Sequence, residues 1–316
     1  MDKNIVVIGS SNIDYIMKMP RLPALGETVT DALFMQTFGG KGANQAVGAV
    51  RAGGSVYFVN CVGDDDGGAL MLEHFKKEGI HSEFIFAEKG IASGAALVMI
   101  GAQGANYLSV APGANYRLTP GHIDRAEEVI RNAAIVVLQF EILPETLKYA
   151  LDLCAKHGVR VLWNCAPARE IERSYLRTVS ILVVNENEAG MLSGIPVAAG
   201  ESVESAAGEL LRSGCGTVII TLGAEGAYVA SRGVSDWIPA FKVDAVDTTA
   251  AGDVYCGCLA VALVEGRTIS ESARFAAAAS AISVTRLGAQ PSAPFRSEID
   301  EFRSHRPAPV PGGGIR

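Results

Sequence analysis

Short apolar runs alternate with longer amphipathic segments along most of the chain. The runs are rich in Val and Ile, and several lack polar alternation, which is typical of parallel strands buried on both faces. We predict strands at Ile5–Ile8, Val56–Val59, Ile135–Gln139, Arg160–Trp163, Ile181–Val184, Thr217–Thr221 and Ala227–Ala230. The pattern therefore predicts an α/β fold built on a mostly parallel sheet.

The amphipathic segments predict helices that connect these strands. We predict helices at Ala43–Ala52, Gly68–Glu78, Glu145–His157 and Ser202–Ser213. The last three are each followed directly by a glycine, the residue type that most often ends a helix in the left-handed conformation. Regular alternation of strand and helix predicts one α/β domain over residues 1–306, with right-handed connections.

Two stretches depart from this alternation. Residues 15–38 contain Pro20 and Pro23 and β-prone pieces but no helix pattern, and residues 92–110 read as a β-hairpin with a glycine-containing turn. We expect both to form a small sheet beside the main one, acting as a lid over a cleft, or alternatively as a packing flap or dimer contact. The Pro- and Gly-rich residues 307–316 predict a flexible tail.

Composition and charge narrow the class of protein. Hydrophobic residues make up 49% of the 316 residues, enough for a large core, which excludes a disordered chain. The net charge of −7 shows no basic surplus, so we expect no nucleic-acid partner. No apolar run reaches the roughly 18 residues of a membrane span, and we expect a cytoplasmic protein with no membrane partner. The six cysteines form no C-x-x-C pair, and we predict buried, reduced thiols.

The segment at 247–253, Asp-Thr-Thr-Ala-Ala-Gly-Asp, precedes a long apolar helix. With Ala250, Ala251 and Gly252 at the helix start, no bulky side chain keeps an anion from the free N–H groups there. Asp253 beside such an anion site could take the proton from a hydroxyl that attacks a phosphoryl group. Alternatively, Asp253 is a first-turn acid that interacts with the helix dipole.

A glycine-rich segment at 38–48 opens the first predicted helix. It is neither a Walker A loop nor a G-x-G-x-x-G dinucleotide fingerprint. Gly40 would allow close backbone approach to a polar ligand, with Lys41 and Asn44 as hydrogen-bonding groups. A simple turn at a helix start explains the same residues.

Polar residues also follow three predicted strands, at the edge where open α/β sheets bind ligands. Asn12 and Asp14 come after the first strand and could bind a ligand or form a short polar turn. Asn185–Glu188 could hold hydrated Mg²⁺ or be a solvated helix start. Thr221–Gly226 is explained equally well as a nucleotide loop and as a hairpin turn.

Taken together, these segments closely resemble the ribokinase branch of the PfkB carbohydrate kinase family. Gly39–Ala46 is similar to the family's first motif and Asp247–Asp253 to its second. Further similar segments are Gln139–Glu141, Asn164–Ala168 and Arg286–Ser292. The resemblance runs from about Ile5 to Phe302. It implies a ribokinase-like three-layer sandwich with a β-sheet lid, and ATP-dependent phosphorylation of D-ribose at O5 to give D-ribose 5-phosphate and ADP.

The resemblance also implies a role for each matching residue. Asp253 would be the general base, with Ala250, Ala251 and Gly252 as the anion hole. The residues implied to bind the sugar are Asn12, Asp14, Gly40, Lys41, Asn44, Glu141 and Asp253. Those implied for ATP are Asn185, Thr221, Gly223, Gly226 and Gly252, with Glu188 acting indirectly on Mg²⁺. Those implied for K⁺ are Asp247, Thr249, Ser283, Arg286, Gly288 and Ser292. The lid would also form a homodimer contact.

Other functions remain open at this point. A sister kinase of the same family could act on deoxyribose, another pentose or a nucleoside. A non-catalytic sugar or nucleotide sensor would have little need of Asp253 beside an anion hole. An NAD-dependent oxidoreductase would need a dinucleotide fingerprint after the first strand, which Gly9–Asn12 does not supply. Val254, Tyr255 and Ala277 depart from the family pattern, and these departures bear on nucleotide fit and sugar choice.

Overall fold

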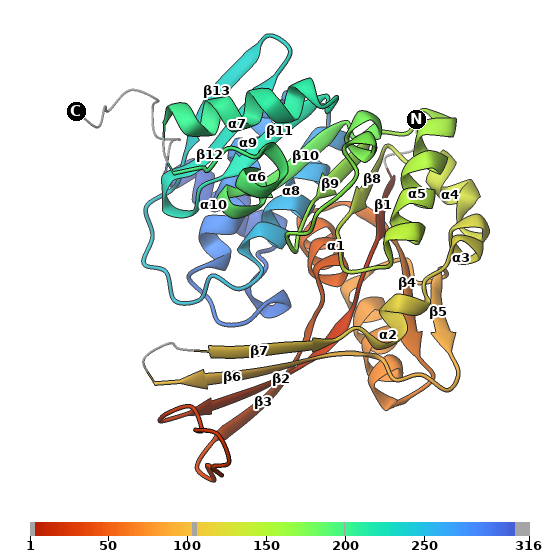
Figure 1. Cartoon of the computed structure of the whole chain (residues 1–316), viewed down its shortest axis with the longest axis vertical. Coiled ribbons are helices and arrows are strands. Elements are labelled where there is room, and N and C mark those ends of the chain that lie inside the picture. Colours follow the sequence, from red (N-terminus) through yellow and green to blue (C-terminus); the bar gives the residue numbers. More distant parts are fainter. Residues whose placement is uncertain (1–3, 103–105, 199, 307–316) are drawn as a thin grey trace.

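A nine-stranded sheet forms the centre of the molecule (Figure 1). The computed structural model describes residues 4–102, 106–198 and 200–306, so the predicted tail at 307–316 lies outside the described residues. In spatial order the strands are β13 (Val234–Pro239), β12 (Gly226–Ser231), β11 (Thr217–Thr221), β10 (Ile181–Asn185), β9 (Val161–Asn164), β8 (Ile135–Leu138), β1 (Asn4–Ile8), β4 (Ser55–Gly63) and β5 (Ile85–Glu88). Strands β11 to β5 pair in parallel, and β12 and β13 add antiparallel strands at one edge, which confirms the predicted mostly parallel sheet.

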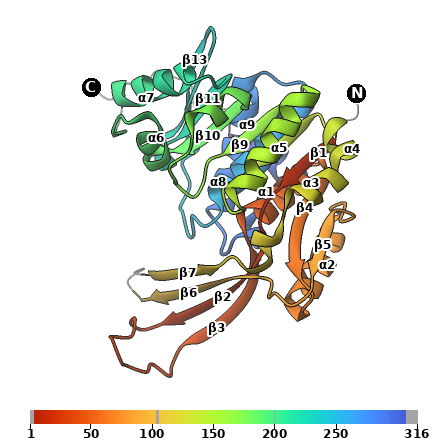
Figure 2. The same ribbon diagram turned by 45° about the vertical axis from the view of Figure 1, so that its right-hand side comes forward.

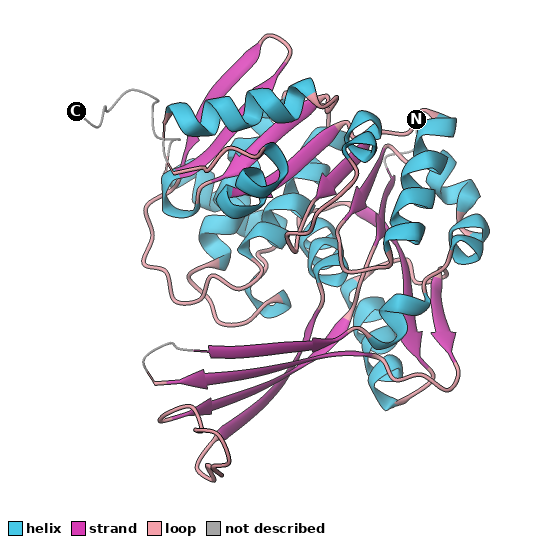
Figure 3. Ribbon diagram, in the orientation of Figure 1, coloured by secondary structure: helices cyan, strands magenta, loops and turns pink. Residues whose placement is uncertain are grey.

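Helices cover both faces of this sheet (Figure 3). One layer contains α1 (Lys41–Arg51), α2 (Asp66–Glu78), α8 (Ala251–Val264), α9 (Ile269–Ser283) and α10 (Arg296–His305). The other contains α3 (Pro120–Arg125), α4 (Glu127–Arg131), α5 (Pro144–His157), α6 (Glu186–Ser193) and α7 (Glu201–Arg212). Ile5 and Val7 of β1 pack into the first layer, while Val6 and Ile8 pack into the second. The alternation of strand side chains thus divides the core in two and gives the predicted three layers.

Glycine ends two of the predicted helices as expected. Gly79 follows α2 with φ 84° and Gly158 follows α5 with φ 66°, both in the left-handed region. Helix α2 begins two residues before the predicted segment, because the side chain of Asp65 accepts a hydrogen bond from the N–H of Gly68 at 2.7 Å and caps the helix. In the part of the chain that the structure describes, no helix is long and apolar enough to span a bilayer.

A second, four-stranded sheet projects from the body (Figures 1 and 2). Its order is β3 (Leu33–Gly39), β2 (Asn12–Met19), β6 (Gly94–Gly101) and β7 (Asn106–Ala111). The expected small sheet is confirmed, and residues 103–105 of the predicted hairpin turn lie outside the described residues. The polar-turn interpretation of Asn12 and Asp14 is wrong, because both residues belong to β2 and are paired to β3 and β6.

Close contact between α1 and α8 joins two parts of the chain more than 200 residues apart. A Cβ atom on Gly257 of α8 would lie 2.4 Å from the carbonyl oxygen of Gln45. A Cβ atom on Gly48 of α1 would lie 3.3 Å from Cα of Val254. The two backbones approach so closely because neither glycine has a side chain. This contact sets the amino-terminal turn of α1 against that of α8.

Gly257→Ala is therefore expected to destabilise the fold by about 1–3 kcal/mol, the range typical of overpacking a core. Gly208→Ala on α7 is a matched control, since its nearest new contact is Arg212 Nη1 at 3.6 Å and alanine favours the helix. Urea unfolding of both variants measures the effect. A Gly257→Ala variant as stable as the control would contradict the proposed backbone contact.

Candidate active site

The carboxylate of Asp253 lies in the first turn of α8 and is held at both oxygens. Asn44 Nδ2 donates to Asp253 Oδ2 at 3.0 Å, and Gln45 Nε2 donates to Asp253 Oδ1 at 3.0 Å. Both amides come from α1, and Asp253 itself is only 5% exposed. The α1–α8 contact therefore creates a buried carboxylate of fixed orientation.

Gln45 is in turn oriented by two more amide side chains. Gln139 Nε2 donates to Gln45 Oε1 at 2.7 Å, and Gln45 Nε2 also donates to Asn164 Oδ1 at 3.0 Å. Sequence analysis assigned Gln45 no role, although Gln139 and Asn164 fell in segments that resembled the family. The signal was available, because a polar residue on an otherwise apolar helix face between Ala43 and Val47 requires buried partners.

The backbone before α8 is unusual at Ala250. Its φ of 58° and ψ of 10° are left-handed, and it is the single non-glycine residue of the described chain with positive φ. This conformation costs an alanine about 1–2 kcal/mol. A Cβ atom on Gly252 would meet nothing within 4 Å, so the space beside this residue of the first turn is open. The arrangement suits the predicted anion hole at Ala250, Ala251 and Gly252, which stays a prediction.

Lys41, the first residue of α1, lies among three of the predicted acids. The charge of Asp253 is the main cause that raises the pKa of Lys41, with Glu141 and Glu188 adding to it and burial opposing. A cation at this point offsets the close approach of these carboxylates. The charges of Lys41, Asp253 and the two glutamates thus act on one another, as expected for residues of one site.

Asn185 and Glu188 bind each other at the start of α6. The N–H of Asn185 donates to Glu188 Oε2 and the N–H of Glu188 donates to Asn185 Oδ1, each at 2.9 Å. This is a capping box. Glu188 is buried rather than solvated, and burial raises its pKa. The solvated-helix alternative is therefore wrong for Glu188.

Asp14 and Glu141 form an acidic pair on the side of the projecting sheet. The Asp14 carboxylate packs over Gly39, where a Cβ atom would lie 2.1 Å from Oδ2, and Asp14 Oδ1 is buried without a hydrogen-bond partner. Burial and the neighbouring Glu141 raise the pKa of Asp14 to about 7. Glu141 Oε2 accepts hydrogen bonds from Ser10 Oγ at 2.5 Å and from the N–H of Lys41 at 3.0 Å.

Asn12 is positioned by Asn115, a residue that sequence analysis missed. Asn115 follows β7 in a short 3₁₀ helix (Gly113–Arg117), and its Nδ2 donates to Asn12 Oδ1 at 2.9 Å. The N–H of Ser11 donates to Asn115 Oδ1 at 2.9 Å. Gly40 lies against the same turn, since a Cβ atom there would be 2.6 Å from Cα of Ser11. No local pattern marks Asn115, because its partners are about 100 residues away in sequence.

The predicted nucleotide segment connects β11 to β12. Thr221 ends β11 beside Asn185 of β10, and its Oγ1 donates to the carbonyl of Val184 at 3.3 Å. Gly223 and Gly226 have positive φ values of 54° and 109°. The antiparallel pairing of β11 and β12 confirms the hairpin-turn interpretation, and the nucleotide role of these residues stays a prediction.

Two segments predicted to bind K⁺ are tied together by Asp247. Its Oδ1 accepts from the N–H of Thr249 and its Oδ2 accepts from the N–H of Gly288, each at 2.9 Å. Burial acts against ionisation of Asp247, yet these hydrogen bonds prevail and lower its pKa. Asp247 therefore spans the start of α8 and the loop after α9.

The rest of the predicted K⁺ segment is also closely bonded. The hydroxyls of Ser283 and Ser292 are 2.7 Å apart, and Ser292 Oγ donates to the carbonyl of Ala289 at 2.7 Å. The Arg286 guanidinium binds Glu298 at 2.5 Å. The Arg286 side chain is thus occupied by Glu298, and the K⁺ role of these residues stays a prediction.

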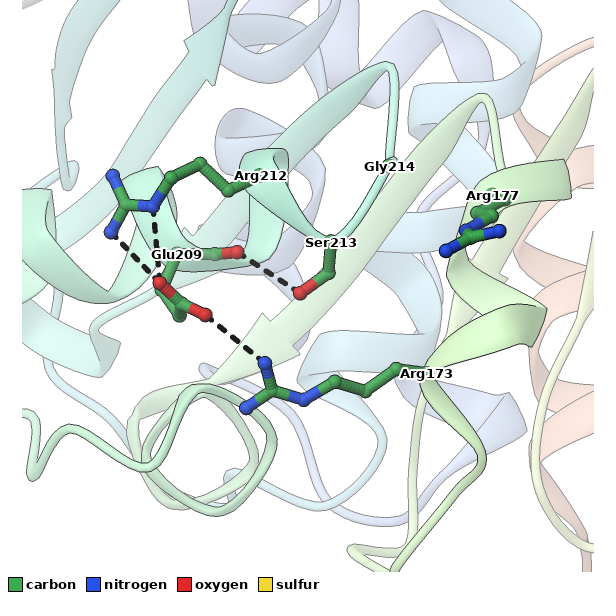
Figure 4. A pocket seen from close by; sticks show the side chains of 6 residues that line it. All are labelled: Arg173, Arg177, Glu209, Arg212, Ser213 and Gly214. Atoms are coloured by element: carbon green, nitrogen blue, oxygen red, sulfur yellow. Dashed lines mark hydrogen bonds and ion pairs between the residues drawn. The ribbon is translucent and has the colours of Figure 1, made fainter.

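A surface pocket lies elsewhere, at the opposite ends of the parallel strands (Figure 4). It is lined by Arg173, Arg177, Glu209, Arg212, Ser213 and Gly214. Glu209 binds two of the arginines, Arg173 at 3.1 Å and Arg212 at 2.8 Å. Gly214 precedes β11, whereas Thr221 ends it, so this pocket is remote from the site at Asp253.

Comparison with known proteins gives the class of protein. The family model for pfkB family carbohydrate kinases matches residues 2–296. A ribokinase of Haemophilus influenzae is 38% identical over 305 residues, covering 96% of this chain and 100% of that protein. A deoxyribokinase of Salmonella typhi is 36% identical over 302 residues, covering 95% and 99%. The solved structure of Arabidopsis thaliana ribokinase complexed with ribose and ATP has a TM-score of 0.90 at 33% identity, covering 96% and 99%.

These comparisons define an enzyme, a carbohydrate kinase, with the fold predicted from the sequence. The chain belongs to the pfkB family of carbohydrate kinases.

Because the pKa of Asp14 is raised in the folded protein, we expect the free energy of unfolding to depend on pH. Between its usual pKa near 3.8 and about 7, folded Asp14 holds a proton that the unfolded chain has lost, so the free energy of unfolding falls as pH rises. The full effect is up to about 4 kcal/mol. Asp14→Asn cannot titrate, and its stability relative to wild type should rise from pH 5 to pH 8. Urea unfolding at both pH values tests this, and parallel pH profiles would contradict the raised pKa.

Proposed function

We propose that this kinase transfers the γ-phosphoryl group of ATP to O5 of D-ribose, giving D-ribose 5-phosphate and ADP. The observation that carries the proposal is the buried, doubly hydrogen-bonded Asp253 at the open start of α8. The similarity to ribokinases along nearly the whole chain supports the sugar, as does the relative whose structure contains ribose and ATP.

Asp253 takes the proton from the attacking hydroxyl in this mechanism. Because Asn44 and Gln45 occupy one lone pair on each oxygen, the carboxylate keeps one orientation and the remaining lone pairs are available to the substrate. The first-turn N–H groups after Ala250 bind the transferred phosphoryl group, where the helix dipole favours developing negative charge. Lys41 adds a positive charge close to Asp253.

The sugar side of the site supplies acceptors for hydroxyl groups. Asp14 Oδ1 and Asn44 Oδ1 are buried without partners, and a buried acceptor of this kind costs about 1–3 kcal/mol until a donor arrives. Adjacent hydroxyls of a sugar provide such donors. Asn12, Gly40, Lys41 and Glu141 complete the proposed sugar pocket.

The nucleotide side rests on fewer contacts. We assign ATP to Asn185, Thr221, Gly223, Gly226 and Gly252, which lie at the ends of β10 and β11 and at the start of α8. The side-chain oxygens of Asn185 and of the buried Glu188 suit Mg²⁺, a hard cation that prefers carboxylate, amide and water oxygens. Mg²⁺ would neutralise charge on the phosphates during transfer.

We assign K⁺ to the two segments that Asp247 joins. Carbonyl oxygens near Thr249, Ser283, Arg286, Gly288 and Ser292 are hard donors of the type a monovalent cation needs. The ion would order the loop before α8 and act on the anion hole through it, without touching the substrate.

We assign a lid and homodimer role to the second sheet. Large apolar side chains are exposed on it: Leu33, Phe34, Tyr107, Leu108 and Val110, with Leu33 72% exposed. Exposed apolar side chains gathered on one element of a fold are typical of an interface. A second copy of the same sheet would cover it in a two-fold dimer.

Asp253→Asn should remove most turnover, because general-base catalysis contributes about 10²–10⁴-fold. Binding of ribose and ATP, followed by calorimetry, should remain largely intact. Asp152→Asn on the exposed face of α5 is the control. Turnover within about threefold of wild type, with binding unchanged, would contradict the assignment of Asp253 as the base.

D-Ribose should exceed 2-deoxy-D-ribose by at least roughly tenfold in kcat/KM, a difference of about 1.4 kcal/mol, because a missing hydroxyl leaves a buried acceptor unpaired. Asp14→Ala should weaken ribose use and reduce this preference. Measuring kcat/KM for both sugars on both proteins decides the question. Equal use by the wild type would favour the deoxyribokinase alternative, which the 36% identical relative keeps open.

Turnover should rise when KCl is added to a K⁺-free assay and respond poorly to NaCl or LiCl. The reason is the pair of loops joined by Asp247, which resemble the monovalent-cation loop of the family. Asp247→Asn should reduce the response to KCl. Wild-type turnover that does not change with added KCl would contradict the proposed K⁺ site.

A further inference from the structure

Three side chains with metal-binding atoms meet at the β5 edge of the main sheet. They are Cys61 of β4, Glu88 of β5 and His122 of α3, and one ligand atom from each lies within 4.8 Å of the others. Over residues 4–102, 106–198 and 200–306, this is the one group of its kind. None of the three belongs to the proposed sugar or nucleotide site.

Contacts around His122 fix its ring. His122 Nε2 is 3.2 Å from Glu88 Oε1, and Nδ1 is 3.8 Å from Cys61 Sγ. The ring stacks on Phe86 with centroids 4.5 Å apart. The N–H of Thr119 donates to Nδ1 at 3.2 Å, with Thr119 Oγ1 3.1 Å from the same atom. The side chain is thus held between three elements before any ligand arrives.

We propose that Cys61, Glu88 and His122 form a binding site for a divalent transition metal of the Zn²⁺ class. One sulfur, one imidazole nitrogen and one carboxylate oxygen are the donors that Zn²⁺ prefers, whereas Mg²⁺ and Ca²⁺ prefer oxygen alone. Three protein ligands leave the fourth position of a tetrahedral site to water.

The distances are close to those a tetrahedral ion needs. With bonds of about 2.0–2.3 Å, a nitrogen and an oxygen on tetrahedral Zn²⁺ lie about 3.3 Å apart, and sulfur lies about 3.5 Å from either. His122 Nε2 and Glu88 Oε1 are 3.2 Å apart, close to this separation. The three ligand atoms lie within 4.8 Å of one another, so Cys61 Sγ must move closer when the ion binds. The Cys61 thiol gives its proton to solvent on binding. Binding through Nε2 moves the ring proton of His122 to Nδ1, which then donates to Thr119 Oγ1 and no longer accepts from the N–H of Thr119.

Burial of the sulfur excludes a catalytic role for Cys61. The order Cys61, His122, Glu88 is that of a nucleophile, a base and an orienting acid. However, Cys61 is 0% exposed and no substrate can reach its sulfur, while burial raises its pKa to about 12. His122 and Glu88 are partly exposed, at 15% and 34%, and an ion can enter from their side.

Titration of the untagged, EDTA-treated protein with Co²⁺ tests the site. We expect one equivalent to bind, with the visible bands of tetrahedral Co²⁺ and a near-ultraviolet thiolate-to-cobalt band, both lost when Zn²⁺ is added. Cys61→Ser should abolish the thiolate band, and Glu88→Gln should weaken Co²⁺ binding by at least about tenfold. Cys154→Ser, which alters another buried thiol of the same layer, should change neither the thiolate band nor the affinity for Co²⁺.

Two results would overturn the proposal: no thiolate band in the wild type, or an unchanged band in Cys61→Ser. Circular dichroism checks that each variant is folded. If Cys61→Ser fails to fold, Glu88→Gln decides, since its side chain is partly exposed, and an affinity equal to wild type would then reject the site. Zn²⁺ should also raise the melting temperature of the wild type and not that of Cys61→Ser.

Discussion

The approach of α1 to α8 is the contact on which the candidate site depends. Without side chains at Gly48 and Gly257, the two backbones touch, and the amides of Asn44 and Gln45 reach the carboxylate of Asp253. A carboxylate buried in a protein core is costly unless it is hydrogen-bonded. The helix contact supplies those hydrogen bonds, so the same two glycines determine both the packing of the helices and the orientation of the Asp253 carboxylate.

Most of the fold was predictable because its strands carry a strong local signal. Val- and Ile-rich runs such as Ile5–Ile8 and Ile181–Val184 are continuous apolar segments, as expected of a strand covered on both faces. The polar-turn alternative for Asn12 and Asp14 arose because only Gly9–Ser11 separates β1 from β2. Short elements such as β5 and α4 lack enough residues to show a period.

The site was predictable in part, and mainly through its resemblance to a family. The motif around Asp253 and the segment around Lys41 have local patterns that could be recognised. Gln45 carried a local signal, a polar residue on an apolar helix face, but its partner Asp253 lies about 200 residues away. Asn115 carried no such signal, and its partner Asn12 lies about 100 residues away. Such roles depend on tertiary contacts, which one sequence without its structure does not reveal.

The connection between the two sheets has a mechanical consequence. Only three residues separate β2 from β1, and Asn12 pairs with Gly39 and Gly94 at the base of the second sheet. Ser11 and Asn115 are buried in the same place and hydrogen-bonded to each other. Any tilt of the second sheet must therefore rotate the backbone that carries Asn12 and Asp14. The angle between the two sheets and the shape of the proposed sugar pocket therefore change together.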